Sequence, residues 1–95
     1  MQKHKIIKLD KIVLFSRQQA KKLGTNVRRA RVSKVIVDFS TVYFISRAFA
    51  DEWLNELEKT KFKKIVSVRH ANPDIKKMIQ IVRKKKNEIR KQFSG

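Results

Sequence analysis

Residues 34–53, KVIVDFSTVYFISRAFADEW, hold the pattern that decides the fold of this chain. Val35 to Val37 are three consecutive β-branched residues, which favours a strand over 34–39. Because this run is apolar on both faces, it predicts a central strand that is covered on both sides. A short turn at 43–45 follows, and an amphipathic helix begins at Ser46. The stretch therefore predicts a strand, loop and helix unit of an α/β domain.

The flanking segments continue this alternation of strands and helices. Apolar segments at 5–9 and 12–15 predict an N-terminal strand or hairpin. We expect one α/β domain over residues 1–95, with a mixed central sheet of about four strands and about three helices packed on it. The remaining expected elements are helices over about 17–30 (with Gly24 weakening its middle), 51–59 and 73–92, and a strand over 62–68.

The helix that follows the central strand has two contrasting sides. Its apolar residues recur at helical spacing, which predicts a buried stripe of Ala50, Trp53, Leu54 and Leu57. Four acids fall largely on the other side, and we expect this acidic face to suit a basic partner or a second copy of the chain. The four acids are Asp51, Glu52, Glu56 and Glu58.

The last helix has clear start signals and an unusual length. Asn72 is suited to cap it, and Pro73 fits the first helical position. Its apolar stripe runs from Ile75 to Val82 and then lapses. A helix of this span is roughly 30 Å long, more than a small sheet covers. We therefore treat 83–95 as a basic C-terminal helical extension that projects, frays or contacts another molecule.

The composition is strongly basic and lacks cysteine. Twenty-five Lys and Arg against eight acids give a net charge of +17. The absence of cysteine excludes disulfides and fits a cytoplasmic protein. No apolar run reaches the roughly 18 residues of a membrane span. A balance this basic favours a polyanionic partner, most commonly nucleic acid, although a merely basic surface explains it equally well.

The basic residues gather along the first helix with its exit and along the last helix. If both helices lay on one side of the sheet, they would form a continuous positive surface. Such a surface would contact phosphates without reading bases, so binding would be sequence-independent and salt-sensitive. The candidate nucleic-acid contacts are Arg28, Arg29, Arg31, Lys77, Arg83, Lys84, Lys85, Lys86, Arg90 and Lys91.

Three segments in this order resemble one known family. They are FSRQQAKK at 15–22, VDFS with SRAFADE at 37–40 and 46–52, and HANPDIKKMI at 70–79. This set resembles the STAS-like domain family of unknown function, which is related to the STAS domain of anti-sigma-factor antagonists. The resemblance implies a recognition scaffold without catalytic residues. It also implies docking to a protein partner that is kinase-like or transcription-associated.

One departure from the related STAS domain concerns its phosphorylated serine. The alignment places Arg47 and Ala48 at the two serine positions, so the phosphoacceptor is missing. Ser46 lies one residue early, and as a helix cap its hydroxyl would be occupied by backbone N–H groups. We favour the capping role over a phosphorylated Ser46. The expected partner-binding residues are Tyr43, Ser46, Arg47, Asp51 and Glu52.

Polar residues inside apolar motifs have a structural interpretation as well. Arg17 and Asp38 are expected to join a salt-bridge and capping network that ties the end of the central strand to helix starts. Asn72 is assigned to the same structural polar network. The alternative is a shallow ligand site at the end of the strand, where open α/β sheets place ligands.

Enzymatic and metal chemistry find little support in the residues. His4 and His70 are the only histidines, and no His, Cys or carboxylate cluster has metal-ligand spacing. Two glycines cannot supply a phosphate-binding loop. We therefore expect no catalytic residues, no metal and no cofactor.

Overall fold

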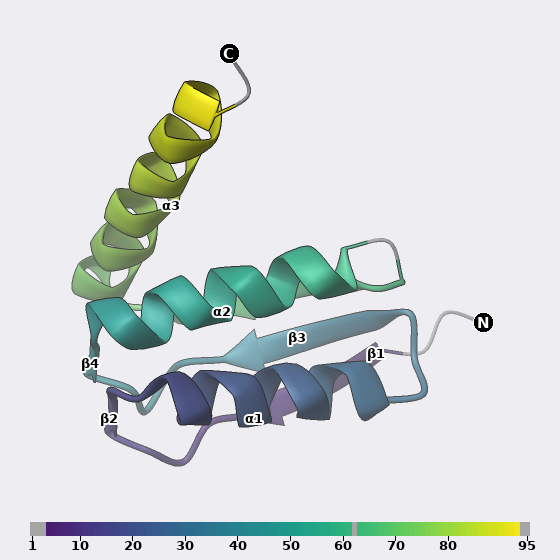
Figure 1. The fold of residues 1–95 in the computed structure, drawn as a ribbon. Helices are drawn as coiled ribbons and strands as arrows, with labels where there is room; N and C mark the ends of the chain where they lie inside the picture. The colour runs from purple at the N-terminus through teal and green to yellow at the C-terminus, as the bar shows by residue number, and fades with distance from the viewer. Residues whose placement is uncertain (1–3, 62, 94–95) are drawn as a thin grey trace.

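The structure is a computed structural model that describes the backbone of residues 4–61 and 63–93, with side chains to Ile89. Strands and helices alternate after two initial strands (Figure 1). In chain order the elements are β1 (His4–Lys8), β2 (Val13–Leu14), α1 (Arg17–Arg29), β3 (Lys34–Asp38), β4 (Phe44–Ile45), α2 (Arg47–Thr60), β5 (Ile65–Arg69) and α3 (Pro73–Phe93).

Two parallel sheets replace the single mixed sheet that the sequence predicted. Within the described residues, β1, β3 and β5 form one sheet in that order, and β2 pairs with β4 in a second. The segments 5–9 and 12–15 are therefore not a hairpin. The β1–β2 and β3–β4 segments instead run side by side in the same direction. The interruption between β1 and β2 lies beside the interruption between β3 and β4. There the Thr41 hydroxyl donates to the Leu9 carbonyl at 2.5 Å.

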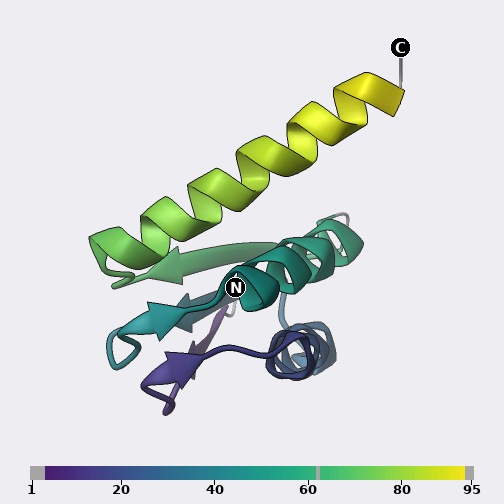
Figure 2. The ribbon, with the colours of Figure 1, turned by 60° about the vertical axis from the view of Figure 1, so that its left-hand side comes forward.

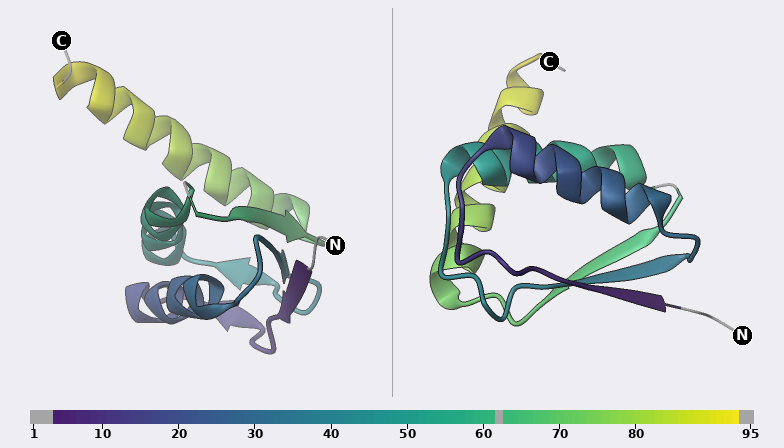
Figure 3. Two further views of the ribbon diagram at one scale, coloured as in Figure 1. Left: turned by 90° about the vertical axis from the view of Figure 1, so that its right-hand side faces the viewer. Right: turned by 90° about the horizontal axis from the view of Figure 1, so that it is seen from below.

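The helices α1 and α2 cover one face of the three-stranded sheet (Figure 3). On that face Val35 and Val37 are fully buried. The opposite face carries Ile6, Ile36 and Ile65, of which Ile6 and Ile65 are exposed and Ile36 is half-buried. The prediction of a central strand covered on both sides is therefore wrong, because α3 packs beside α2 instead of on that second face.

The helix α1 runs unbroken through Gly24, against the expectation that this glycine weakens its middle. The glycine has a packing role. A Cβ atom at position 24 would lie only 2.7 Å from Cβ of Glu56 on α2, closer than real carbon contacts allow. The two helix backbones therefore approach each other at a point where no larger residue fits.

The helix α3 spans 21 residues, which confirms the length expected from the sequence. Ile75 and Val82 on its first half are buried, and the helix packs against α2 and β4. Its second half rises away from the strands (Figures 1 and 2). Ile81 and Ile89 on α3 remain exposed.

Candidate interaction surface

The two-stranded sheet carries a cluster of exposed apolar side chains at one end of the molecule. In β2 and β4, Leu14 and Ile45 are paired and point into the core, whereas their neighbours Val13 and Phe44 are paired and face outward. Adjoining residues add to the outward side. We call this cluster the apolar end, and its members, between 43% and 74% exposed, are Ile12, Val13, Phe15, Tyr43 and Phe44.

Hydrogen bonds fix the backbone of the apolar end. The Tyr43 N–H donates to the Ile12 carbonyl at 2.8 Å, and the Ser46 N–H donates to the Leu14 carbonyl at 2.8 Å. Asn72 adds a third connection, because its side-chain amide donates to the Tyr43 carbonyl at 3.1 Å. The same Asn72 accepts the Ile75 N–H at 2.9 Å and so caps α3.

Serine caps anchor α1 and α2 to the same end. Ser16 caps α1 together with Gln19, and the Gln19 side chain accepts the Phe15 N–H at 2.9 Å. Ser46 caps α2 by accepting the Phe49 N–H at 3.0 Å, and its hydroxyl donates to the Phe15 carbonyl at 2.6 Å. The Ser46 hydroxyl is thus engaged as both donor and acceptor. All three helix starts hold the apolar end in place.

A charged cluster lies beside this end, at the start of α2. Asp51 accepts a 2.5 Å bond from Arg17 on α1 and a 2.7 Å bond from Lys86 on α3. Hydrogen bonds from Lys86 and then from Arg17 lower the pKa of Asp51, and the bond to Asp51 raises the pKa of Arg17. Lys86 also donates to Asn55 at 2.8 Å. Asp51 therefore bridges α1 and α3 across α2.

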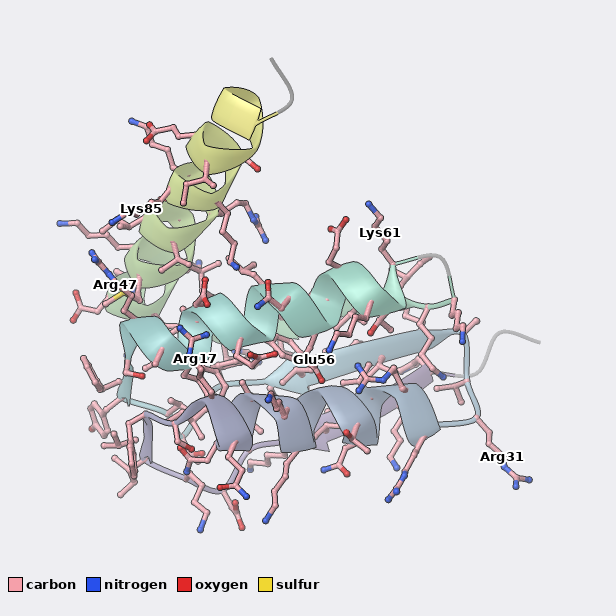
Figure 4. All side chains as sticks on the ribbon, viewed as in Figure 1. Arg17, Arg31, Arg47, Glu56, Lys61 and Lys85 are labelled. Atoms are coloured by element: carbon pink, nitrogen blue, oxygen red, sulfur yellow. The ribbon has the colours of Figure 1, made fainter. Side chains whose placement is uncertain are left out.

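The expected acidic docking face of α2 is largely internal. Glu52 is only 7% exposed and Glu56 only 2%, so neither forms a docking surface and that prediction is wrong. Glu56 lies between α2 and α1 (Figure 4), 3.1 Å from Arg28 and 3.0 Å from Lys59. Burial is the largest influence and raises the pKa of Glu56, but the bonds from Lys59 and Arg28 together lower it. Glu52 and Glu56 therefore pair with cations of the same domain.

The predicted polar network separates into three places. Arg17 pairs with Asp51 and approaches Glu52 at 3.8 Å, whereas Asp38 lies at the end of β3 and pairs with Arg69 at 3.1 Å. The pKa of Asp38 is lowered, chiefly because its carboxylate accepts the Ser40 backbone N–H at 2.8 Å and also pairs with Arg69. Asn72 makes its contacts at the start of α3.

The basic clusters of α1 and α3 do not merge into one surface, because α2 lies between the two helices (Figures 1 and 3). Of the candidate nucleic-acid contacts, Arg28 forms an ion pair with Glu56, and Lys86 forms one with Asp51. The side chains of Arg90 and Lys91 lie outside the described residues. The others are exposed, namely Arg29, Arg31, Lys77, Arg83, Lys84 and Lys85.

A groove of about 220 Å³ runs between the start of α2 and the middle of α3. The sequence interpretation assigned no function to its apolar residues Ile81 and Ile89, which are exposed and fall outside the stripe that packs on the core. Their spacing from Lys85, four residues on each side, was the available signal. The lining consists of Arg17, Arg47, Asp51, Ile81, Val82, Lys85, Lys86 and Ile89.

Comparisons with protein-family models, with curated proteins and with solved structures find no match to this chain. Within residues 4–61 and 63–93, no helix is long and apolar enough to cross a membrane. The same part of the chain holds no group of three or more His, Cys, Asp or Glu residues placed to bind a metal ion.

Proposed function

We propose that this protein is a non-enzymatic, STAS-like regulatory module that docks a protein partner through the apolar end. The observation that carries the proposal is the exposure of five large apolar side chains on two adjoining segments. Contiguous apolar surface of this kind marks interaction sites on small domains. The family resemblance favours a partner that is kinase-like or transcription-associated.

The rigidity of the apolar end supports docking. Tyr43 and Phe44 belong to the residue types that are enriched at the centres of protein interfaces. Their backbone is already held by Ile12 and Asn72, so little ordering entropy is lost when a partner binds. Arg47, which is exposed three residues after Phe44, adds a charge at the rim of the same surface.

Site-specific photo-crosslinking in the source cells tests this assignment. A photoreactive phenylalanine analogue replaces Tyr43 in one variant and the exposed Lys22 of α1 in the control. We expect one discrete partner adduct from position 43 and none of the same mass from position 22. The adduct should disappear when Phe15→Ser and Ile12→Ser are added. Equal adducts from both positions would show that the apolar end is not the docking surface.

A second candidate function is sequence-independent binding of nucleic acid. The specific observation is that five of the eight acids, Asp38, Asp51, Glu52, Glu56 and Glu58, are in ion pairs within the domain. Each pair also neutralises a cation, so the net charge is unchanged, but few carboxylates remain to offset the unpaired Lys and Arg side chains. Phosphate contacts from such a surface release counterions and weaken steeply with salt.

Fluorescence anisotropy with DNA and RNA across a salt series tests this second function. Lys77→Glu with Lys84→Glu removes two exposed cations from one face of α3, and Lys21→Glu with Lys22→Glu makes the same charge change on α1. If α3 is the binding element, the first pair weakens binding several-fold more than the second and flattens the salt slope. Equal losses would indicate a general polycation effect.

A further inference from the structure

We infer that the groove between α2 and α3 binds an acidic amphipathic segment of the partner protein. This inference rests on the proposed docking function and names the chemistry of what docks. It concerns a place adjacent to the apolar end but formed by other residues. The groove joins apolar and basic side chains in one concave site, and both kinds contribute to the choice of ligand.

The apolar part of the groove follows one face of α3. Ile81, Lys85 and Ile89 lie four residues apart, so each step along the helix axis is about 6 Å. Ile81 and Ile89 are exposed although they belong to a helix that buries Val82 against the core. A ligand that fits this face presents apolar side chains about two helical turns apart with an acid between them. That is the pattern of an amphipathic helix laid into a groove.

The charged part of the groove favours an acidic ligand. Four cations line it, and the one carboxylate among its described lining residues, Asp51, is already bound by Arg17 and Lys86. In the described part of the chain, Arg47 and Lys85 have no carboxylate partner. Figure 4 shows Arg17, Arg47 and Lys85 along the same side of the molecule. Acidic residues on the ligand would pair with these two cations beside an apolar floor, where solvent screens them less than on an open surface.

A second copy of this chain fits the groove poorly. Most of the acids that a copy would need are occupied, because Asp51 bridges two helices and Glu52 and Glu56 are buried. The exposed Asp10, Asp74 and Glu88 are single carboxylates that are well separated in the sequence. What remains outside is mainly cationic, so two copies repel each other. The groove therefore suits a different protein that supplies the missing negative charge.

A nucleic acid also matches the groove less well than a peptide. Phosphate contacts need cations but no apolar floor, and bases stack on aromatic side chains. The groove is floored by Ile81, Val82 and Ile89, and none of its lining residues up to Ile89 is aromatic. Arg17 and Arg47 lie within three residues of Phe15 and Phe44, so a single protein partner would cover the groove together with the apolar end.

Anisotropy with a fluorescent peptide tests the inference on the whole protein. The probe is a peptide of about 15 residues in which Leu and Glu form an amphipathic helix. One comparison probe has the same composition in scrambled order, and another is an oligothymidine of similar length. At about 150 mM salt we expect the amphipathic peptide to bind about tenfold tighter than either comparison probe.

Matched variants locate the binding site. Arg47→Glu with Lys85→Glu should weaken the amphipathic peptide about tenfold or more. Lys77→Glu with Lys84→Glu carries the same charge change at positions of α3 that do not line the groove, and should weaken it less than about threefold. Circular dichroism and thermal melting verify that both variants fold. Equal weakening by the two variants, or equal affinity for the scrambled peptide, would overturn the inference. Tighter binding of the oligothymidine would also overturn it and favour the nucleic-acid function.

The same titration separates this inference from the proposed docking function. Ile12→Ser with Phe15→Ser alters the apolar end but leaves every lining residue of the groove, and the crosslinking position 43, in place. This variant should bind the amphipathic peptide like the unaltered protein while it loses the photo-crosslinked partner. Loss of peptide binding in this variant would mean that the groove is not an independent site.

Discussion

The two sides of α2 differ in how closely they are packed. Toward α1, the backbones approach so closely at Gly24 that no Cβ atom fits, and the carboxylate of Glu56 is sealed between the helices. Toward α3, contact depends on Ile75, Val82 and a bridge from Lys86 to Asp51 and Asn55. The first interface stabilises the domain, and the second leaves grooves that a partner can fill.

The largest loss of stability should come from adding a Cβ atom where α1 and α2 approach most closely. Gly24→Ala improves helix propensity by about 1 kcal/mol but inserts a Cβ against Glu56. Because overpacking costs more than this gain, we expect a net loss of about 2 kcal/mol in the free energy of unfolding. Urea denaturation measures it, with Asn26→Ala at an exposed position of the same helix as control. A Gly24→Ala protein that is more stable than the original would show that α1 and α2 do not approach so closely.

Removing the sealed carboxylate should have a slightly smaller effect. Glu56→Ala leaves Arg28 and Lys59 without their anion, but both cations are partly exposed and regain some hydration. We expect a loss of about 1–2 kcal/mol, less than for a fully buried pair. Glu88→Ala, at an exposed position, should change stability by less than about 0.5 kcal/mol. Similar losses for the two variants would contradict the importance assigned to Glu56.

Acid should weaken the charged contacts on both sides of α2. The folded-state pKa values of Asp38, Asp51 and Glu56 are lowered, so the unfolded chain binds more protons in the acid range. Stability therefore rises with pH through that range and is lost as pH falls below about 4. Urea midpoints between pH 7 and pH 3 measure this slope. Glu56→Gln should make the slope shallower. An unchanged slope would mean that Glu56 does not contribute to the loss of stability in acid.

The smallest loss of stability is expected from a change at the contact between α2 and α3. Lys86→Met removes the bridge to Asp51 and Asn55 but keeps an aliphatic side chain, so we expect a loss of at most about 1 kcal/mol. Amide hydrogen exchange should accelerate in α3 beyond Val82 while α1 is unaffected. Faster exchange in α1 of this variant would mean that the two sides of α2 are not independent.

Local signals in the sequence determined the helices with good accuracy. Ser46 and Asn72 were assigned as caps, and each accepts the expected backbone N–H in the structure. Such signals are reliable because a cap acts on residues only three positions away. The α/β class and the length of α3 followed from the same short-range patterns. The partner and the family assignment stay predictions.

Only the tertiary structure decided which strands pair and which sides of α2 are buried. Hydropathy assigned Glu52 and Glu56 to solvent, because one apolar stripe usually means one buried face. This helix instead contacts α1 and α3 as well as the sheet, so acids on its flanks are enclosed and paired with cations more than 25 residues away. The groove with Ile81 and Ile89 arises in the same way, since its walls come from three helices. Long-range packing sets these features, and no local pattern of residues contains it.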